Sequence, residues 1–117
     1  MVWEVCIPDA QYRYASKERI ASVCRALPRL PYHTCKNDEG PTFAAVMDHT
    51  SIPHVLEHAV IELQAQNAVS PTTLFVGTTV WLDESEGRAR IEVGFADDLD
   101  ALRAFRAAIQ IIDAAMI

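Results

Sequence analysis

The sequence has no long apolar run and few aromatic residues, which argues against a membrane-spanning helix and against a core rich in aromatic side chains. No apolar stretch approaches the roughly 20 residues that a membrane-spanning helix requires, so we expect no membrane partner. The N-terminus lacks the basic start and the long apolar stretch of a signal peptide, and we therefore expect a cytoplasmic protein. Aromatic residues make up only 8% of the chain, so the core is predicted to consist mostly of Val, Ile, Leu and Ala.

Cysteine is also scarce. The three cysteines, Cys6, Cys24 and Cys35, are an odd number and contain no Cys-x-x-Cys pair. This pattern argues against a disulfide framework and against a cysteine-rich zinc knuckle. Cys6 and Cys24 stand among apolar residues, and we predict that both are buried as small hydrophobic side chains.

Basic residues are too few for a nucleic-acid partner. Ten Lys and Arg stand against sixteen Asp and Glu, which gives a formal net charge of −6. Proteins that bind nucleic acid normally carry a basic patch, so we expect no nucleic-acid partner. The acidic balance mildly favours a neutral or cationic partner, and it is equally typical of an ordinary acidic surface.

The chain length of 117 residues, half of them hydrophobic, predicts a single domain over residues 1–117 with one core. Alternation and β-branched residues predict four strands, at residues 2–7, 43–47, 72–82 and 88–95. N-cap residues and helical spacing predict three helices, at about residues 16–27, 51–66 and 98–116. The core stripe of the last helix is predicted to be Leu99, Leu102, Phe105, Ile109, Ile112 and Met116. The order β-α-β-α-β-β-α predicts an α+β fold of two layers, a mostly antiparallel sheet with helices on one face.

The segment from His54 to Glu62 is the best candidate for a functional site. On a helix, His54 and His58 lie one turn apart, roughly 6 Å along the axis and about 40° apart around it, so both rings can bind one metal ion. Glu57 falls on the same side, where it can hold a metal-activated water and act as the catalytic base. This H-x-x-E-H spacing is that of the inverzincins, and it predicts a Zn²⁺ site with His54 and His58 as ligands.

The third ligand is less defined. Glu62 lies a further turn along on the same side, and we predict it as a ligand. Ligands at i, i+4 and i+8 spread over about 12 Å, so a role for Glu62 as an acceptor for His58 is an alternative. Other candidates elsewhere in the chain are His33, His49, Glu84 and Glu92. A helix face with two His and two Glu is also an ordinary solvated surface, but the apolar Ile61 between them indicates that this face is partly covered.

Two stretches carry a family resemblance. Residues 27–35, with Leu-Pro-Arg-Leu and then His-Thr-Cys, and residues 50–64 resemble the N-terminal domain of cyanophycin synthetases, which has a similar H-V-x-E-H-x-x-x-E-L-Q helix. A Gly-containing segment, a hairpin and a closing amphipathic helix follow in that family, and residues 75–79 and 90–114 are similar to them. The likeness covers roughly residues 23–117 and is sharpest over residues 50–64.

The resemblance implies a domain that precedes an ATP-grasp domain and a Mur-ligase-like domain and that engages the Asp–Arg polymer. In some members it implies a metallopeptidase-like site that cuts polymer into primers, and the helix also looks like that of pitrilysin-type peptidases. Carried onto this chain, the zinc ligands are His54 and His58, the base is Glu57, and Glu62 matches the following glutamate. The chain ends where the ligase domains would begin, so we expect that it does not itself make cyanophycin. The basic residue after the family's Gly-containing turn is replaced by Thr78 or Thr79, so binding of the same polymer does not follow.

These observations lead to one main hypothesis and two rivals. The main hypothesis is a stand-alone zinc-dependent hydrolase of peptide or isopeptide-like amide bonds, with a peptide or polymer as substrate. The first rival is a non-catalytic module, derived from the same domain, that binds a polymer or a protein. The second rival is a homo-oligomeric structural protein, because the closing helix is apolar on more than one side through Ile109, Ile111, Ile112, Ala115, Met116 and Ile117.

Overall fold

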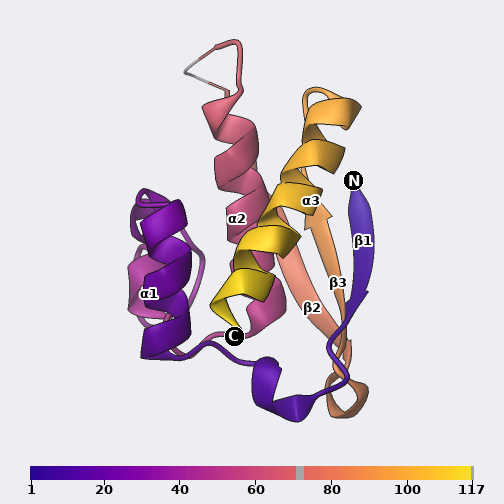
Figure 1. Ribbon diagram of the computed structural model, residues 1–117. Coiled ribbons are helices and arrows are strands. Elements are labelled where there is room, and N and C mark those ends of the chain that lie inside the picture. The colour runs from indigo at the N-terminus through magenta and orange to yellow at the C-terminus, as the bar shows by residue number, and fades with distance from the viewer. Residues whose placement is uncertain (71–72, 117) are drawn as a thin grey trace.

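The computed structural model describes residues 1–70 and 73–116 and confirms the α+β class. Its main elements are β1 (Val2–Cys6), α1 (Lys17–Ala26), α2 (Ile52–Gln66), β2 (Gly77–Asp83), β3 (Arg88–Val93) and α3 (Asp98–Ala115). Four short 3-10 turns connect them: η1 (Ala10–Tyr12), η2 (Leu30–Tyr32), η3 (Phe43–Ala45) and η4 (Glu84–Glu86). The strands form an antiparallel sheet in the order β1-β3-β2, with α2 and α3 packed against one face (Figure 1).

Each helix begins where a capping side chain stands. Ser16, Ser51 and Asp97 each accept a hydrogen bond from the backbone N–H three residues ahead, which satisfies one of the free amides of the first turn. Pro53 lies in the first turn of α2, where a missing N–H costs nothing. Because Ser51 caps α2, the neighbouring Thr50 keeps its hydroxyl available for a side chain of the helix.

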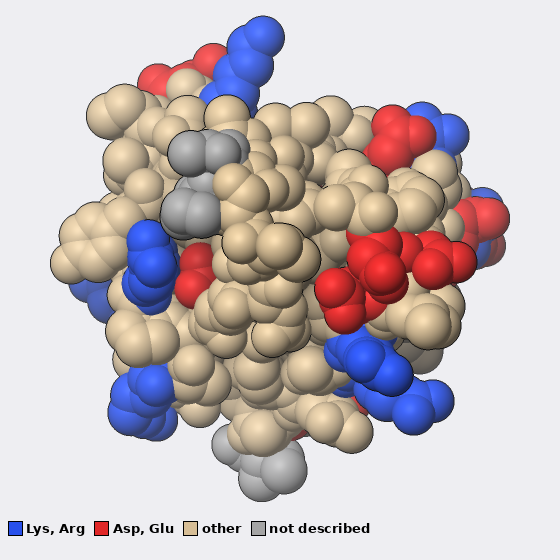
Figure 2. Space-filling view, turned by 90° about the horizontal axis from the view of Figure 1, so that it is seen from above, with Lys and Arg blue, Asp and Glu red and all other residues tan. Residues whose placement is uncertain are grey.

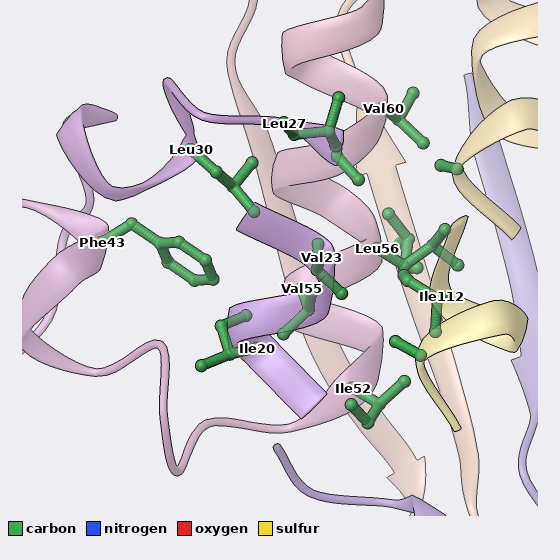
Figure 3. Close-up of a cluster of buried hydrophobic side chains, with 14 of the residues drawn as sticks. Ile20, Val23, Leu27, Leu30, Phe43, Ile52, Val55, Leu56, Val60 and Ile112 are labelled. Carbon is green, nitrogen blue, oxygen red and sulfur yellow. The ribbon is translucent and has the colours of Figure 1, made fainter. Parts of the chain in front are cut away.

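The core lies between the sheet and the helices. β3 is the central strand, and its Ala89, Ile91 and Val93 are essentially fully buried against the helix layer. Figure 3 shows the other side of α2, where Val55 and Leu56 meet side chains from α1 and from the segment after it, including Leu30 and Phe43. Helix α2 is therefore covered on nearly every side, and ten of its fifteen residues are buried.

The strand predicted at residues 43–47 is wrong. This segment forms the 3-10 turn η3, in which the Val46 N–H donates to the Phe43 carbonyl at 3.0 Å. The Phe43 N–H donates to the His33 carbonyl at 2.8 Å, and Thr34 and Thr42 form an isolated bridge. The apolar residues of this segment suggested a strand. In the structure Phe43 is buried in the core, and the segment does not join the sheet.

The strand predicted at residues 72–82 begins later than expected. Regular pairing starts at Gly77, and residues 73–76 approach the sheet with only the Gly94 N–H bonded to the Val76 carbonyl, at 2.8 Å. Position 72 of this predicted strand and position 117 of the closing helix predicted to be apolar lie outside the described residues.

Two burial predictions are also wrong. In α3, Leu99 and Leu102 are 57% and 49% exposed, whereas the buried positions are Ala101, Ala104, Ala108, Ile112 and Ala115. The alanines face α2 because small side chains let two helices pack closely, and the leucines point outward. Cys6 is exposed, because Trp3 and Val5 take the inward positions of β1 and strand alternation turns Cys6 outward.

Charged side chains do not form one continuous patch on the face shown in Figure 2. The face in Figure 2 shows acidic and basic residues in small separate groups around uncharged surface, without a broad basic patch on that face. Among the described residues, no helix is both long and apolar enough to span a membrane.

Candidate metal centre

The polar residues of α2 lie in the interior rather than in solvent. Glu57, His58 and Glu62 are only 3–4% exposed, so the prediction of a partly covered polar face is confirmed. Residues 33–36 of the loop after η2 cover one side, and the start of β2 covers the other. Between them lies a cleft of about 930 Å³, and His54, Glu57 and His58 line its wall.

His58 is held in a fixed orientation. The ring of Phe43 stacks on it with centroids 4.1 Å apart and an angle of 22° between the planes. Its Nδ1 lies 3.1 Å from Nδ1 of His33. Burial, together with the nearby His54 and His33, lowers the pKa of His58 from 6.5 to about 3. The ring is therefore neutral at physiological pH and carries a lone pair that can bind a metal ion.

His54 is oriented by the residue before its helix cap. Its Nδ1 lies 2.8 Å from the Thr50 hydroxyl oxygen, and its ring meets the edge of Phe43 with centroids 5.2 Å apart. Burial lowers the pKa of His54 below its usual value. Its Nε2 is directed at Sγ of Cys35, 3.6 Å away, so a second neutral imidazole presents a nitrogen to the same point.

Cys35 completes a cluster of three potential metal ligands. Cys35, His54 and His58 each offer one donor atom, and these atoms all lie within 4.8 Å of one another. Zinc ligands at their usual bond lengths stand about 3.3–3.8 Å apart, and the Cys35–His54 separation of 3.6 Å falls in that range. One sulfur and two imidazole nitrogens suit zinc, and three protein ligands leave a fourth position for a substrate or water.

The sequence did not point to Cys35 as a ligand. It lies 19 residues before His54, in a loop outside any periodic pattern. The Phe43–His33 hydrogen bond and the Thr34–Thr42 bridge fold this loop over α2. The only signal was that residues 33–35 belong to the stretch that resembles a known family.

Glu57 lies beside the cluster in a position shaped by β2. Oε1 accepts a hydrogen bond from the Thr79 hydroxyl at 2.6 Å, and Oε2 is 3.9 Å from Nε2 of His58. Burial raises the pKa of Glu57 above its usual value, and the Thr79 hydrogen bond offsets part of that rise. A Cβ at Gly77 would lie 3.0 Å from Cγ of Glu57 and 2.9 Å from the Glu92 carbonyl oxygen, so only glycine leaves room for the carboxylate.

Glu62, predicted as the third ligand, does not lie among these three donors. Its Oε1 is 2.9 Å from Nε2 of His33, and its Oε2 accepts from the Gln66 amide at 3.1 Å. Glu62 therefore contacts His58 only indirectly, through His33. The predicted alternative, in which Glu62 is a hydrogen-bond acceptor for His58, differs from this because His33 lies between them. His33, another candidate ligand, lies between the two.

The remaining candidate ligands lie away from the cluster. His49 is on the surface between Glu39 and Asp48, at 2.8 and 2.7 Å. Glu84 bonds to the Tyr14 hydroxyl in the turn η4. Glu92 lies on the exposed face of β3, paired with Val2 and Thr78.

The sequence matches the family described as "Cyanophycin synthase-like N-terminal domain" over residues 14–117, which includes all three potential ligands and Glu57. No curated protein matches the chain.

Proposed function

The chain belongs to the cyanophycin synthase-like N-terminal domain family, and from that premise we propose that it is a zinc-dependent hydrolase of peptide or isopeptide-like amide bonds. One observation carries the proposal: Cys35, His54 and His58 converge beside the Glu57 carboxylate in the wall of a cleft. We further propose a cytoplasmic location, because a reducing compartment keeps a cysteine ligand as a thiol.

The proposed ligands differ from those expected on sequence. His54 and His58 keep their expected role, and Cys35 takes the third place instead of Glu62. Held by these three residues, zinc would supply Lewis acidity to an amide carbonyl and would acidify a water in the cleft.

Glu57 is proposed as the general base and acid. It would take a proton from the attacking water while the C–O bond forms, and then deliver it to the amine nitrogen as the C–N bond breaks. Thr79 would hold the carboxylate at the correct angle by its hydrogen bond to Oε1. The raised pKa of a buried carboxyl suits this exchange, because the group must both accept and release a proton near neutral pH.

The cleft favours an amide substrate with modest charge. Among the described residues that line it, Lys36 is the only basic one apart from histidine, and Glu57 is the only carboxylate. The rest of the lining is mainly threonines and apolar side chains, among them Ile61, Leu74, Phe75 and Val76. The family description names cyanophycin, so the Asp–Arg polymer belongs in the substrate panel together with short peptides of apolar and of charged residues.

The first test is the zinc content of the purified protein, measured by mass spectrometry. We expect about one zinc per chain in the wild type and in His49→Ala, the matched control with an exposed histidine. Cys35→Ala and His58→Ala should lose the metal. Equal, near-zero zinc in the wild type and in His58→Ala would exclude the proposed site.

The second test is cleavage of the substrate panel by the wild type and by Glu57→Gln. Glu57→Gln should keep its zinc and lose at least roughly 100-fold in kcat/KM, because the variant lacks the base. Val80→Thr, at an exposed position of β2 outside the cleft lining, should cleave at the wild-type rate. If no member of the panel is cut although zinc is bound, the catalytic proposal fails.

The alternative proposal is a non-catalytic module that binds a peptide or polymer in the same cleft. The observation that favours it is the rim, where Leu74 and Val76 are 89% and 73% exposed, as at a docking surface. This alternative predicts that Glu57→Gln binds the panel with unchanged affinity and that neither protein releases a product. Titration calorimetry with the same peptides separates the two proposals.

A further inference from the structure

Two buried or nearly buried side chains, His33 and Glu62, form a line behind the candidate ligand His58. Glu62 Oε1 lies 2.9 Å from His33 Nε2, and His33 Nδ1 lies 3.1 Å from His58 Nδ1. His58 and Glu62 are 3% and 4% exposed, and the His33 side chain is 16% exposed. Hydrogen bonds in such surroundings are strong and are not readily exchanged for water.

The direction of these hydrogen bonds follows from counting protons. Glu62 accepts from the Gln66 amide through Oε2, and as a carboxylate it also accepts through Oε1, so the proton of the second contact belongs to His33 Nε2. We take this to be the single proton of the His33 ring, which leaves a lone pair and no proton on its Nδ1. The contact between the two Nδ1 atoms needs one proton, and only His58 can supply it. With that assignment, His58 is the Nδ1–H tautomer, with the lone pair on Nε2.

Nε2 of His58 is the nitrogen that the site needs. It lies 3.9 Å from Oε2 of Glu57, the carboxylate proposed as the base. The stacked ring of Phe43, which is fully buried, opposes rotation of the imidazole. Phe43 therefore fixes the plane of the ring, and His33 with Glu62 fixes which of its nitrogens carries the proton.

We propose that His33 and Glu62 are positioning residues: they form a relay that holds His58 in the Nδ1–H tautomer and presents its Nε2 lone pair to the cleft. The purpose of the relay rests on the proposed function, but the proposed tautomer requires neither metal nor substrate. The relay also strengthens His58 as a ligand, because a hydrogen bond from the second ring nitrogen to a chain that ends in a carboxylate increases the basicity of the first.

The decisive experiment is long-range ¹H–¹⁵N NMR on ¹⁵N-labelled, metal-free protein, which distinguishes the two histidine tautomers by their nitrogen shifts. In the wild type we expect His58 to carry its proton on Nδ1. A proton on Nε2 in the wild type would overturn the proposal without any variant, since the relay would then run in the opposite direction.

Variants test whether His33 is the cause. His33→Leu removes both hydrogen bonds and should give a mixture of His58 tautomers, whereas His33→Gln restores an acceptor for His58 and a donor for Glu62. His49→Leu, at an exposed histidine, should leave the His58 signals unchanged. An unchanged Nδ1–H tautomer in folded His33→Leu contradicts the relay.

Zinc affinity gives a second readout. His33→Leu should weaken zinc binding by roughly 10- to 100-fold, and His33→Gln should recover most of the loss. If the wild type binds no zinc, the proposed function fails while the tautomer result still decides the relay. If zinc binds with equal affinity in His33→Leu, the relay does not position the ligand.

Discussion

Two histidines of this protein lie in opposite environments, although each contacts other titratable groups. His49 is on the surface and contacts two carboxylates, Glu39 and Asp48, whose hydrogen bonds raise its pKa. His58 lies inside the fold against His33, His54 and Phe43, and burial lowers its pKa to about 3. The exposed histidine thus favours the protonated form, whereas the buried one favours the neutral form.

The difference shows that burial, rather than the number of polar partners, prepares a histidine for metal binding here. Protonated His49 has no lone pair to offer, and its two carboxylates hold it in that form. His58 lies 3.9 Å from the Glu57 carboxylate and 3.1 Å from His33, and burial keeps its ring neutral, with a lone pair available. The predictions below disturb the buried cluster in steps, from the largest expected effect to the smallest.

The largest effect is expected from removing the apolar cover. Phe43→Ala deletes a fully buried ring that touches both His54 and His58, and it should lower the free energy of unfolding by about 3–5 kcal/mol. Phe95→Ala, at a phenylalanine that is 48% exposed, should cost less than about 1 kcal/mol. Denaturant unfolding in the presence of a chelator measures both. Similar losses for the two variants would contradict the picture of a covered cluster.

Acid should destabilise the metal-free protein through His58. Its pKa is about 3 in the folded protein and 6.5 in an unstructured peptide, so the unfolded chain binds the extra proton between these values. Stability is therefore fully present above pH 6.5 and falls as the pH drops toward 3. At about 1.4 kcal/mol per pKa unit, the loss between pH 7 and pH 4 is on the order of 2–4 kcal/mol.

The neighbours of His58 modify this slope. His54, whose pKa is also lowered, adds to it, and Glu57, whose pKa is raised, opposes it just above pH 4.5. Unfolding curves at several pH values, with chelator, should become flatter in His58→Gln and stay steep in His49→Gln. A wild-type stability that is constant from pH 7 to pH 4 would show that His58 is not buried as a neutral ring.

A smaller effect is expected at Gly77. In Gly77→Ala the new Cβ would press on Glu57 and on the Glu92 carbonyl, which should cost about 1–3 kcal/mol and displace the carboxylate from the cluster. Gly94→Ala is the matched control, because its Cβ would meet Val76 backbone atoms only at 3.5 Å or beyond. Thermal unfolding of both, together with the cleavage assay, measures the effect. Unchanged stability and cleavage in Gly77→Ala would contradict the close contact between position 77 and Glu57.

The smallest effect is expected at Thr79. Thr79→Val keeps the shape of the side chain but removes the hydrogen bond to Glu57, which should cost about 1–2 kcal/mol. The pKa of Glu57 should rise further, because the hydrogen bond that opposes the rise is gone. Thr78→Val, on the outer face of β2, should change stability by less than about 0.5 kcal/mol. Carboxyl-carbon NMR titration of Glu57 and unfolding curves check both statements.

Much of the fold could be predicted from the sequence because local signals agree with it. The three helices begin close to the predicted positions, at caps Ser16, Ser51 and Asp97, and the alternation of residues 88–93 marks the central strand. The errors arose where apolar residues serve another purpose. Phe43 fills the space above two histidines instead of joining a sheet, and alanines rather than leucines form the buried side of α3.

The candidate site also has one part that could be predicted from the sequence and one part that could not. The spacing of His54, Glu57 and His58 follows from helix geometry, so it could be read from one segment. Cys35 and His33 come from a loop whose path depends on backbone hydrogen bonds and on the burial of Phe43. Helical periodicity contains no information about such a loop, which is why Glu62 seemed the nearest third ligand.

The arrangement of the sheet has a consequence for the order of folding. β1 occupies residues 2–6, yet its sole strand partner in the described chain is β3, with Val2 opposite Glu92. During synthesis β1 therefore stays unpaired until β3, more than 80 residues later in the chain, has been made. Long-range pairing of this kind is slow because so much chain must be ordered first. The hairpin of β2 and β3 is local and forms a ready template, so β1 is expected to dock last and to be released first when the protein unfolds.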